Sequence, residues 1–166
     1  MKKILSLLLM IFALSMNNAQ ERAKRHIYNS EDNARQKIDS TVAVAQKENK
    51  FVFLQVGGNW CVWCLRFNKL TEENADIHKV LESNFIVYHL NYSKENKNEA
   101  VLKQLGFPQR FGFPVFVILN KKGERIHTQQ SDFLEDGGTG YDEGKVKTFL
   151  EQWSPEALNP ENYERK

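Results

Sequence analysis

The stretch FVFLQVGGNWCVWC, residues Phe51 to Cys64, decides how the rest of the chain is interpreted. Its first six residues, Phe51 to Val56, are almost wholly apolar and rich in β-formers, which is typical of a central strand buried on both faces. The strand ends at a pair of glycines, and the residues from Cys61 onward suit a helix. This places Cys61 in the first helical turn, where free backbone N–H groups and the helix dipole favour a thiolate. The pattern therefore indicates a nucleophilic cysteine.

The first 19 residues have the pattern of a cleavable secretory signal peptide. Lys2 and Lys3 precede an apolar run, Ile4 to Leu14, which is too short to span a bilayer as a stable helix. We therefore predict cleavage after Ala19 and a periplasmic or secreted protein. An uncleaved N-terminal anchor stays open as the alternative.

The chain that this cleavage would leave is electrically balanced. The whole chain of 166 residues has 23 Lys and Arg and 21 Asp and Glu; residues 1–19 include two lysines and no acids, so 21 of each sign would remain. Such a balance argues against a nucleic-acid binder, and we expect no nucleic-acid partner. With 41% apolar and 27% charged residues, the chain has room for one domain with a hydrophobic core.

We place this domain at residues 30–154. Residues 20–29 are mostly polar and are expected to be disordered or loosely docked, and residues 155–166 are expected to form a C-terminal tail. An apolar repeat near 3.6 residues predicts a first helix from Glu31 to about Glu48, with Ser30 as its N-cap.

The remaining elements are predicted from the same kinds of pattern. Further helices are expected at residues 61–70, 75–83, 99–105 and from 142 or 143 to 153, and further strands at 85–90, 115–119 and 124–128. This order implies a small α/β sandwich, with parallel crossovers in its first half and an antiparallel hairpin in its second. Pro114 stands at the head of the 115–119 strand, so it belongs at a chain reversal, where a cis bond is tolerable.

The sequence resembles the thioredoxin superfamily. The resemblance rests on the motif WCVWC at residues 60–64, about fifty residues ahead of the Gly-Phe-Pro turn at 112–114. More narrowly, the chain is similar to secreted thioredoxin-like proteins with a Trp inside the Cys-x-x-Cys motif, over about residues 33–153. The resemblance implies a thioredoxin-like three-layer α/β sandwich, in which helices flank a mixed sheet of about four strands. It also implies a thiol-disulfide oxidoreductase that acts on protein clients.

The resemblance further implies roles for individual residues. Cys61 would be the exposed attacking thiol, Cys64 the buried resolving thiol, and Pro114 a cis-proline packed against the disulfide. Trp60 and Phe113 would take part in substrate docking. For Trp63, which lies between the cysteines, two interpretations are open.

In the first interpretation, Trp63 joins Phe113 in an apolar patch that docks the client. In the second, Trp63 folds back onto the scaffold. The sequence does not decide between the two.

Two departures from thioredoxins bear on the chemistry. Thioredoxins carry a buried acid six positions before the first cysteine, where it assists proton removal from the second, and Gln55 stands there in this chain. A neutral amide cannot act as a base, so Cys64 must lose its proton to water or to another group. Val62 and Trp63 lie between the cysteines in place of Gly-Pro, and no histidine is there to stabilise a thiolate strongly. We therefore expect a reductant or an exchange catalyst rather than a strong oxidant.

We expect neither a cofactor nor a metal at this site. A zinc site needs two more ligands, and His78 has no second histidine three to five residues beyond it. Haem attachment requires a histidine directly after the motif, where Leu65 stands. An inert disulfide and a redox-inactive binding or chaperone module stay open as alternatives. The expected partners are proteins with a disulfide or a dithiol and a redox partner protein in the same compartment.

Overall fold

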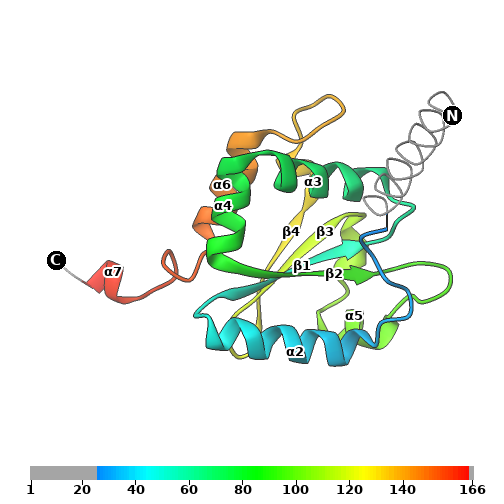
Figure 1. The fold of residues 1–166 in the computed structure, drawn as a ribbon, viewed down its shortest axis with the longest axis horizontal. Helices are drawn as coiled ribbons and strands as arrows, with labels where there is room; N and C mark the ends of the chain where they lie inside the picture. Colours follow the sequence, from blue (N-terminus) through cyan, green and yellow to red (C-terminus); the bar gives the residue numbers. More distant parts are fainter. Residues whose placement is uncertain (1–25, 165–166) are drawn as a thin grey trace, which may run out of the picture.

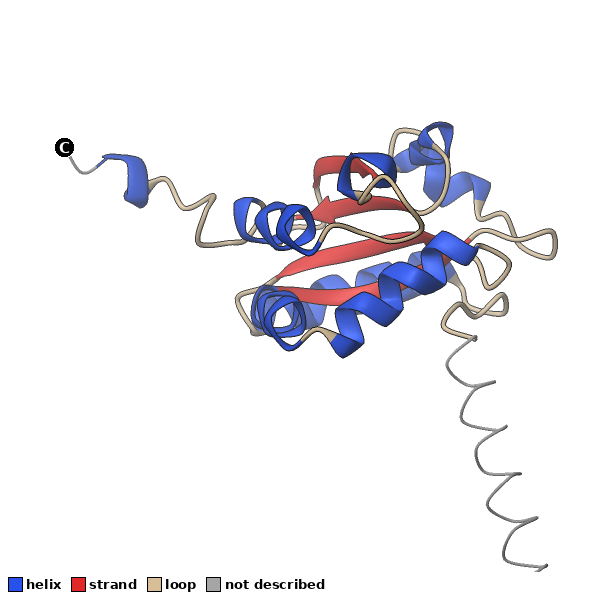
Figure 2. Ribbon diagram, turned by 90° about the horizontal axis from the view of Figure 1, so that it is seen from above, coloured by secondary structure: helices blue, strands red, loops and turns tan. Residues whose placement is uncertain are grey.

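The computed structural model describes residues 26–164, so the predicted signal peptide at residues 1–19 lies outside the described part. A four-stranded sheet of order β2-β1-β3-β4 forms the centre, with helices on both faces (Figures 1 and 2). The central strand β1 (Phe51–Gly57) pairs in parallel with β2 (Phe85–Asn91) and antiparallel with β3 (Val115–Leu119). Strand β4 (Arg125–Gln130) pairs antiparallel with β3 at the edge. The predicted three-layer sandwich with a mixed sheet is therefore confirmed.

Two hydrophobic clusters, one on each face of the sheet, hold the helices in place. Helices α2 (Ala34–Lys47) and α5 (Glu99–Gln104) cover one face, where Val52, Leu54 and Val56 of β1 point. Phe51 and Phe53 of β1 belong to the cluster on the other face, which is covered by α3 (Val62–Glu73), α4 (Ala75–Asn84) and α6 (Glu143–Gln152). Strand β1 is buried along its whole length, and the short loop that leads to Cys61 follows it directly.

Two helix boundaries differ from those expected. The first helix begins at Ala34, because the side chain of Asn33 rather than Ser30 is the N-cap and accepts the N–H of Gln36 at 3.2 Å. The segment 71–74 does not interrupt the next helix, which continues to Glu73. Asn74 then caps α4 by accepting the N–H groups of two of its first residues.

The segment before α2 is more firmly attached than the sequence indicates. Tyr28 falls in the range 20–29 that was expected to be disordered or loosely docked, yet it is only 3% exposed. Its N–H donates to Oδ1 of Asn59 at 3.1 Å, and Nδ2 of Asn59 donates to the Tyr28 carbonyl oxygen at 2.7 Å. These two bonds attach the segment to the loop between β1 and α3, which corrects the expectation for Tyr28.

The remaining elements are short. Single turns of 3-10 helix lie at Pro108–Phe111 and Ser131–Leu134. Helix α7 (Glu161–Glu164) has no buried residue and projects away from the sheet, within the predicted C-terminal tail (Figure 1). None of the helices in residues 26–164 is long and apolar enough to cross a membrane.

Candidate active site

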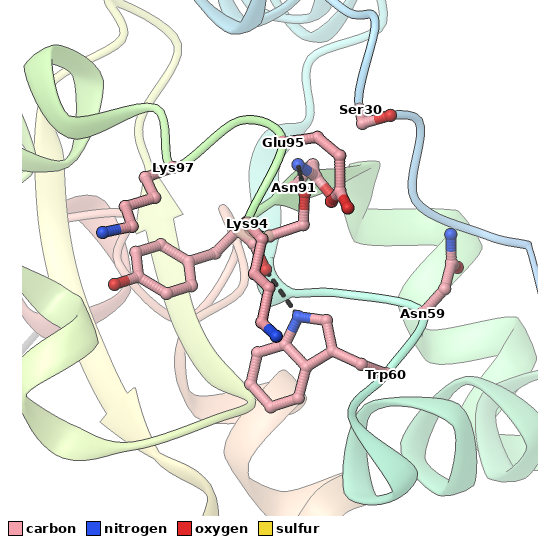
Figure 3. A pocket seen from close by; sticks show the side chains of 9 residues that line it. Ser30, Asn59, Trp60, Asn91, Lys94, Glu95 and Lys97 are labelled. Atoms are coloured by element: carbon pink, nitrogen blue, oxygen red, sulfur yellow. Dashed lines mark hydrogen bonds between the residues drawn. The ribbon is translucent and has the colours of Figure 1, made fainter.

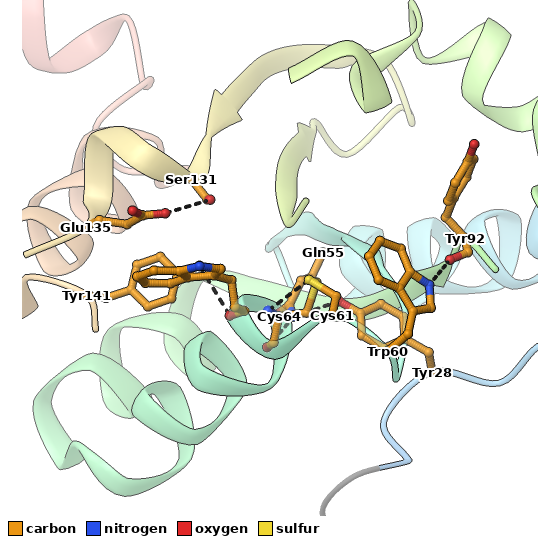
Figure 4. The surroundings of a disulfide bond; sticks show 10 residues. Tyr28, Gln55, Trp60, Cys61, Cys64, Tyr92, Ser131, Glu135 and Tyr141 are labelled. Atoms are coloured by element: carbon orange, nitrogen blue, oxygen red, sulfur yellow. Dashed lines mark hydrogen bonds between the residues drawn. A yellow bond between two sulfur atoms is a disulfide. The ribbon is translucent and has the colours of Figure 1, made fainter. Parts of the chain in front are cut away.

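Cys61 and Cys64 form a disulfide at the start of α3 (Figure 4). Cys61 is the N-cap of the helix rather than part of its first turn, and its sulfur accepts the N–H of Cys64 at 3.2 Å. Backbone N–H groups at a helix start stabilise a thiolate, so this position favours ionisation of Cys61 when the disulfide is open. The structure brings the two predicted cysteines together, while their roles in exchange stay predictions.

The disulfide is covered more completely than the sequence indicates. Cys61 is 5% exposed and Cys64 is fully buried, so the expected exposure of Cys61 is wrong for this oxidised form. The two cysteines and Tyr28 form one small cluster, against which Ile27, Trp63 and Phe113 pack. The cover comes from three separate parts of the chain: the segment before α2, the motif itself and the turn before β3.

Gln55 lies beneath the disulfide, at the position where thioredoxins carry an acid. It is 1% exposed, and its Nε2 donates both to the Cys64 carbonyl oxygen at 2.9 Å and to the Tyr28 hydroxyl at 2.7 Å. The amide therefore joins β1, the first turn of α3 and the segment before α2. It serves as a hydrogen-bond donor in this position and has no means of accepting a proton as a base.

The turn before β3 lies next to the redox pair. The peptide bond between Phe113 and Pro114 is cis, as the resemblance implies. Phe113 packs against the disulfide cluster, and its ring also meets Trp60 edge to face at 5.4 Å and stacks on Tyr92 at 4.8 Å. The Phe113 ring, next to the cis bond, thus connects the disulfide cluster with the exposed ring of Trp60.

The two tryptophans of the motif have opposite surroundings. Trp60 is 56% exposed, and its Nε1 donates to the Tyr92 carbonyl oxygen at 2.7 Å. Trp63 is partly buried, with its ring edge to face on Tyr141 at 5.5 Å and the Arg66 guanidinium 4.8 Å from its centre. Of the two interpretations left open by the sequence, the structure therefore favours the one in which Trp63 folds back onto the scaffold.

A cavity of about 490 Å³ opens beside Trp60 (Figure 3). It lies between the start of the redox motif and the loop that follows β2. Its walls are Ser30, Asn59, Trp60, Asn91, Tyr92, Ser93, Lys94, Glu95 and Lys97. Sequence reasoning missed this cavity, because residues 92–98 are mostly polar and nothing in their pattern indicates that they fold beside Trp60.

Two titratable side chains, buried Tyr28 and partly buried His89, lie in or beside the disulfide cluster. Burial raises the pKa of Tyr28 far above its ordinary value, so its hydroxyl is neutral at any physiological pH. The ring of His89 on β2 meets the ring of Tyr28 at 5.4 Å, and burial lowers the pKa of His89 to about 4. Within residues 26–164, no group of His, Cys, Asp and Glu is arranged to hold a metal ion.

Comparison with known proteins gives one family and several similar folds. The model of the thioredoxin-like family matches residues 33–121, which is more than half of the chain. A disulphide isomerase from Xylella fastidiosa Temecula1 has a TM-score of 0.66 and 19% identity, covering 75% of this chain and 94% of that one. The oxidised C-terminal domain of DsbD from Neisseria meningitidis has a TM-score of 0.51 and 21% identity, covering 73% and 95%. At these identities the likeness concerns the fold alone. No curated protein sequence matches the chain.

Proposed function

The chain belongs to the thioredoxin-like family, and on this premise we propose that it is a thiol-disulfide oxidoreductase that acts on protein clients. The observation that carries the proposal is the Cys61–Cys64 disulfide at the N-terminus of α3, beside the turn that contains the cis Phe113–Pro114 bond. The disulfide closes too small a loop to stabilise a domain of this size, which argues against a purely structural role.

Exchange begins when the Cys61 thiolate attacks a sulfur of a client disulfide. The client S–S bond breaks, a mixed disulfide forms between Cys61 and the client, and one client thiolate leaves. Cys64 then loses its proton to water or to that thiolate and attacks the Cys61 sulfur, which releases the second client sulfur as a thiolate. Two electrons pass from the protein dithiol to the client, and the reverse sequence oxidises a client dithiol.

Cys61 is assigned the attacking role for two reasons. It keeps a small exposed fraction of 5%, whereas Cys64 is fully buried. As the N-cap of α3 it also lies at the end of the helix where the dipole favours negative charge. Cys64 lies one turn deeper, where it reaches the Cys61 sulfur but not a client disulfide.

We assign client docking to the rim formed by Trp60, Phe113 and Tyr92, together with the cavity beside Trp60. The exposed indole of Trp60 offers apolar area next to the sulfurs, and Phe113 connects this rim to the disulfide cluster. A client segment lying on the rim would place its disulfide within reach of Cys61. Large aromatic side chains of this kind supply much of the binding energy at protein interfaces.

We further propose that the protein works after export, in the periplasm or outside the cell. The support is the signal-peptide pattern of residues 1–19, since an oxidising compartment maintains disulfides in its proteins. Because no histidine stands between the cysteines, we assign the protein the role of reductant or exchange catalyst. A redox partner protein would return its cysteines to the reduced state after each cycle. Titration of the Cys61/Cys64 couple against glutathione tests the direction: a potential near about −270 mV fits a reductant, and one near about −120 mV an oxidant.

The activity is tested by the reduction of a disulfide-bonded protein with dithiothreitol. The wild-type protein is expected to accelerate this reaction, and Cys61→Ser to return it to the rate of dithiothreitol alone. Cys64→Ser is expected to accumulate a mixed disulfide with the client, visible on a non-reducing gel. Equal rates for wild type and Cys61→Ser would contradict the proposal and favour a redox-inactive binding or chaperone module.

A further inference from the structure

Tyr28 lies beside the buried sulfur of the redox pair and has no part in the exchange steps described above. A Cβ added at Gly57 would collide with the Cys64 sulfur and would stand only 2.9 Å from the Tyr28 hydroxyl oxygen. The hydroxyl and the sulfur therefore both face Gly57, and the lack of a side chain at Gly57 makes room for both. Figure 4 shows Tyr28 and Gln55 beside the disulfide.

The hydroxyl of Tyr28 has a proton to donate. Its oxygen accepts a hydrogen bond from Nε2 of Gln55 at 2.7 Å, which orients the hydroxyl and leaves its own hydrogen directed elsewhere. Among the hydrogen bonds of residues 26–164, none uses the Tyr28 hydroxyl as the donor. A donor that itself accepts a hydrogen bond is polarised, so it binds an anion more strongly.

The titratable side chains next to Tyr28 supply no positive charge to a thiolate at Cys64. Burial raises the pKa values of both Tyr28 and Tyr141, so both phenols are neutral. His89, which packs against the Tyr28 ring, is neutral above a pKa of about 4, and the carboxylate of Glu72 on α3 acts on His89 by its charge. A thiolate formed at Cys64 would thus be a buried anion, which is costly unless a hydrogen bond stabilises it.

We propose that the Tyr28 hydroxyl donates a hydrogen bond to the Cys64 sulfur when the disulfide is open, and that it thereby stabilises the Cys64 thiolate in the resolving step. The proposal rests on the exchange function proposed above. Tyr28 keeps its own proton throughout, and the Cys64 proton goes to water or to the client thiolate, so the exchange balances as already written. In this chain a neutral hydroxyl from the segment before α2, oriented by Gln55, takes the place of the buried acid of thioredoxins.

The test measures the ionisation of Cys64 directly. In the Cys61→Ser variant, Cys64 is the remaining cysteine, and its titration midpoint is followed by the ¹³Cβ chemical shift of labelled cysteine. Adding Tyr28→Phe removes one hydroxyl and keeps the ring, and it is expected to raise the midpoint by about one pH unit, which is about a tenfold smaller ionisation constant. The control is Tyr88→Phe, the same chemical change on β2 in the cluster packed on α2 and α5, and it is expected to leave the midpoint unchanged.

An unchanged midpoint in Tyr28→Phe would overturn the proposal. If circular dichroism shows that this variant does not fold, Gln55→Met replaces it, because loss of the orienting amide is expected to shift the midpoint in the same direction. An unchanged midpoint there would overturn the proposal equally.

A second measurement separates this proposal from the exchange function. With both cysteines present, Tyr28→Phe is expected to slow release of the client from the mixed disulfide about tenfold near neutral pH and to move the pH profile of release upward. If the wild-type protein shows no turnover but the Cys64 midpoint shifts, the exchange function fails and the hydrogen bond stands. If turnover is normal and neither the midpoint nor the pH profile shifts, the Tyr28 proposal alone fails.

Discussion

The two sides of the disulfide are built from different kinds of residue. On the inner side, Tyr28, Gln55 and Cys64 are nearly or fully buried, and Gln55 joins the other two by hydrogen bonds. On the outer side, Trp60 and Phe113 form an aromatic edge next to an open cavity, and Trp60 is more than half exposed. In the proposed function, polar groups inside the protein act on the thiols, whereas apolar rings face the client.

The largest expected effect concerns Trp63, which belongs to the scaffold although it stands inside the motif. Trp63→Ala removes a ring that packs against both the disulfide cluster and the cluster around Tyr141. We expect the free energy of unfolding of the oxidised protein to fall by about 2–3 kcal/mol, somewhat less than for a fully buried aromatic residue. Urea unfolding measures this. A loss below about 0.5 kcal/mol would place Trp63 on the client-facing side instead.

The second effect concerns pH, because the ring of His89 packs against Tyr28 on the inner side. Its pKa is about 4 in the folded protein and about 6.5 when unfolded, so the unfolded state binds more protons between these values. Stability is therefore complete above about pH 7 and is lost as the pH falls toward 4, by about 2 kcal/mol at pH 5.

The measurement for His89 is urea unfolding at pH 7.5 and at pH 5. In His89→Phe, this part of the pH dependence is expected to disappear. The lowered pKa of His127 contributes to wild type and variant alike, so the difference between them isolates His89. Identical pH dependence in the two proteins would show that His89 is protonated as easily folded as unfolded.

The smallest effect concerns Trp60 on the outer side. Trp60→Ala is expected to raise the KM for a protein client by about three- to tenfold, with a change in unfolding free energy below about 1 kcal/mol, because the exposed ring contributes little to packing. Phe133→Ala is the control, since Phe133 is 69% exposed on a different part of the surface. Steady-state reduction of the client at several concentrations gives the KM. An equal rise for both variants would remove the special role of Trp60.

Contiguous patterns in the sequence were sufficient to predict the backbone elements that carry the two cysteines. The apolar run of β1, the glycine pair and the two cysteines follow one another directly, so periodicity and spacing predict the strand, the turn and the helix start. The chain reversal at Pro114 was predictable for the same reason, because the proline stands immediately before the apolar strand β3, whereas its cis bond was implied by the resemblance.

The parts that escaped prediction depend on contacts between distant segments. Tyr28 lies in a polar stretch, and its bonds to Gln55 and Asn59 join residues 27 and 31 positions apart. The contact of Trp60 with the loop after β2 spans 32 positions. The prediction of the α2 cap failed for a local reason, because Ser30 and Asn33 are both good capping residues. The side chain of Asn29 bonds to Glu31 and Asp32 in a turn, and the helix begins only after this turn, with Asn33 as its cap.

The paired hydrogen bonds between Tyr28 and Asn59 have a practical consequence for preparing the protein. They hold the beginning of the folded domain next to the sulfurs, whereas α7 at the opposite end stands clear of the sheet (Figure 1). An affinity tag fused just before residue 26 would lie close to the proposed docking rim, so purification tags and fluorescent labels belong at the carboxyl end.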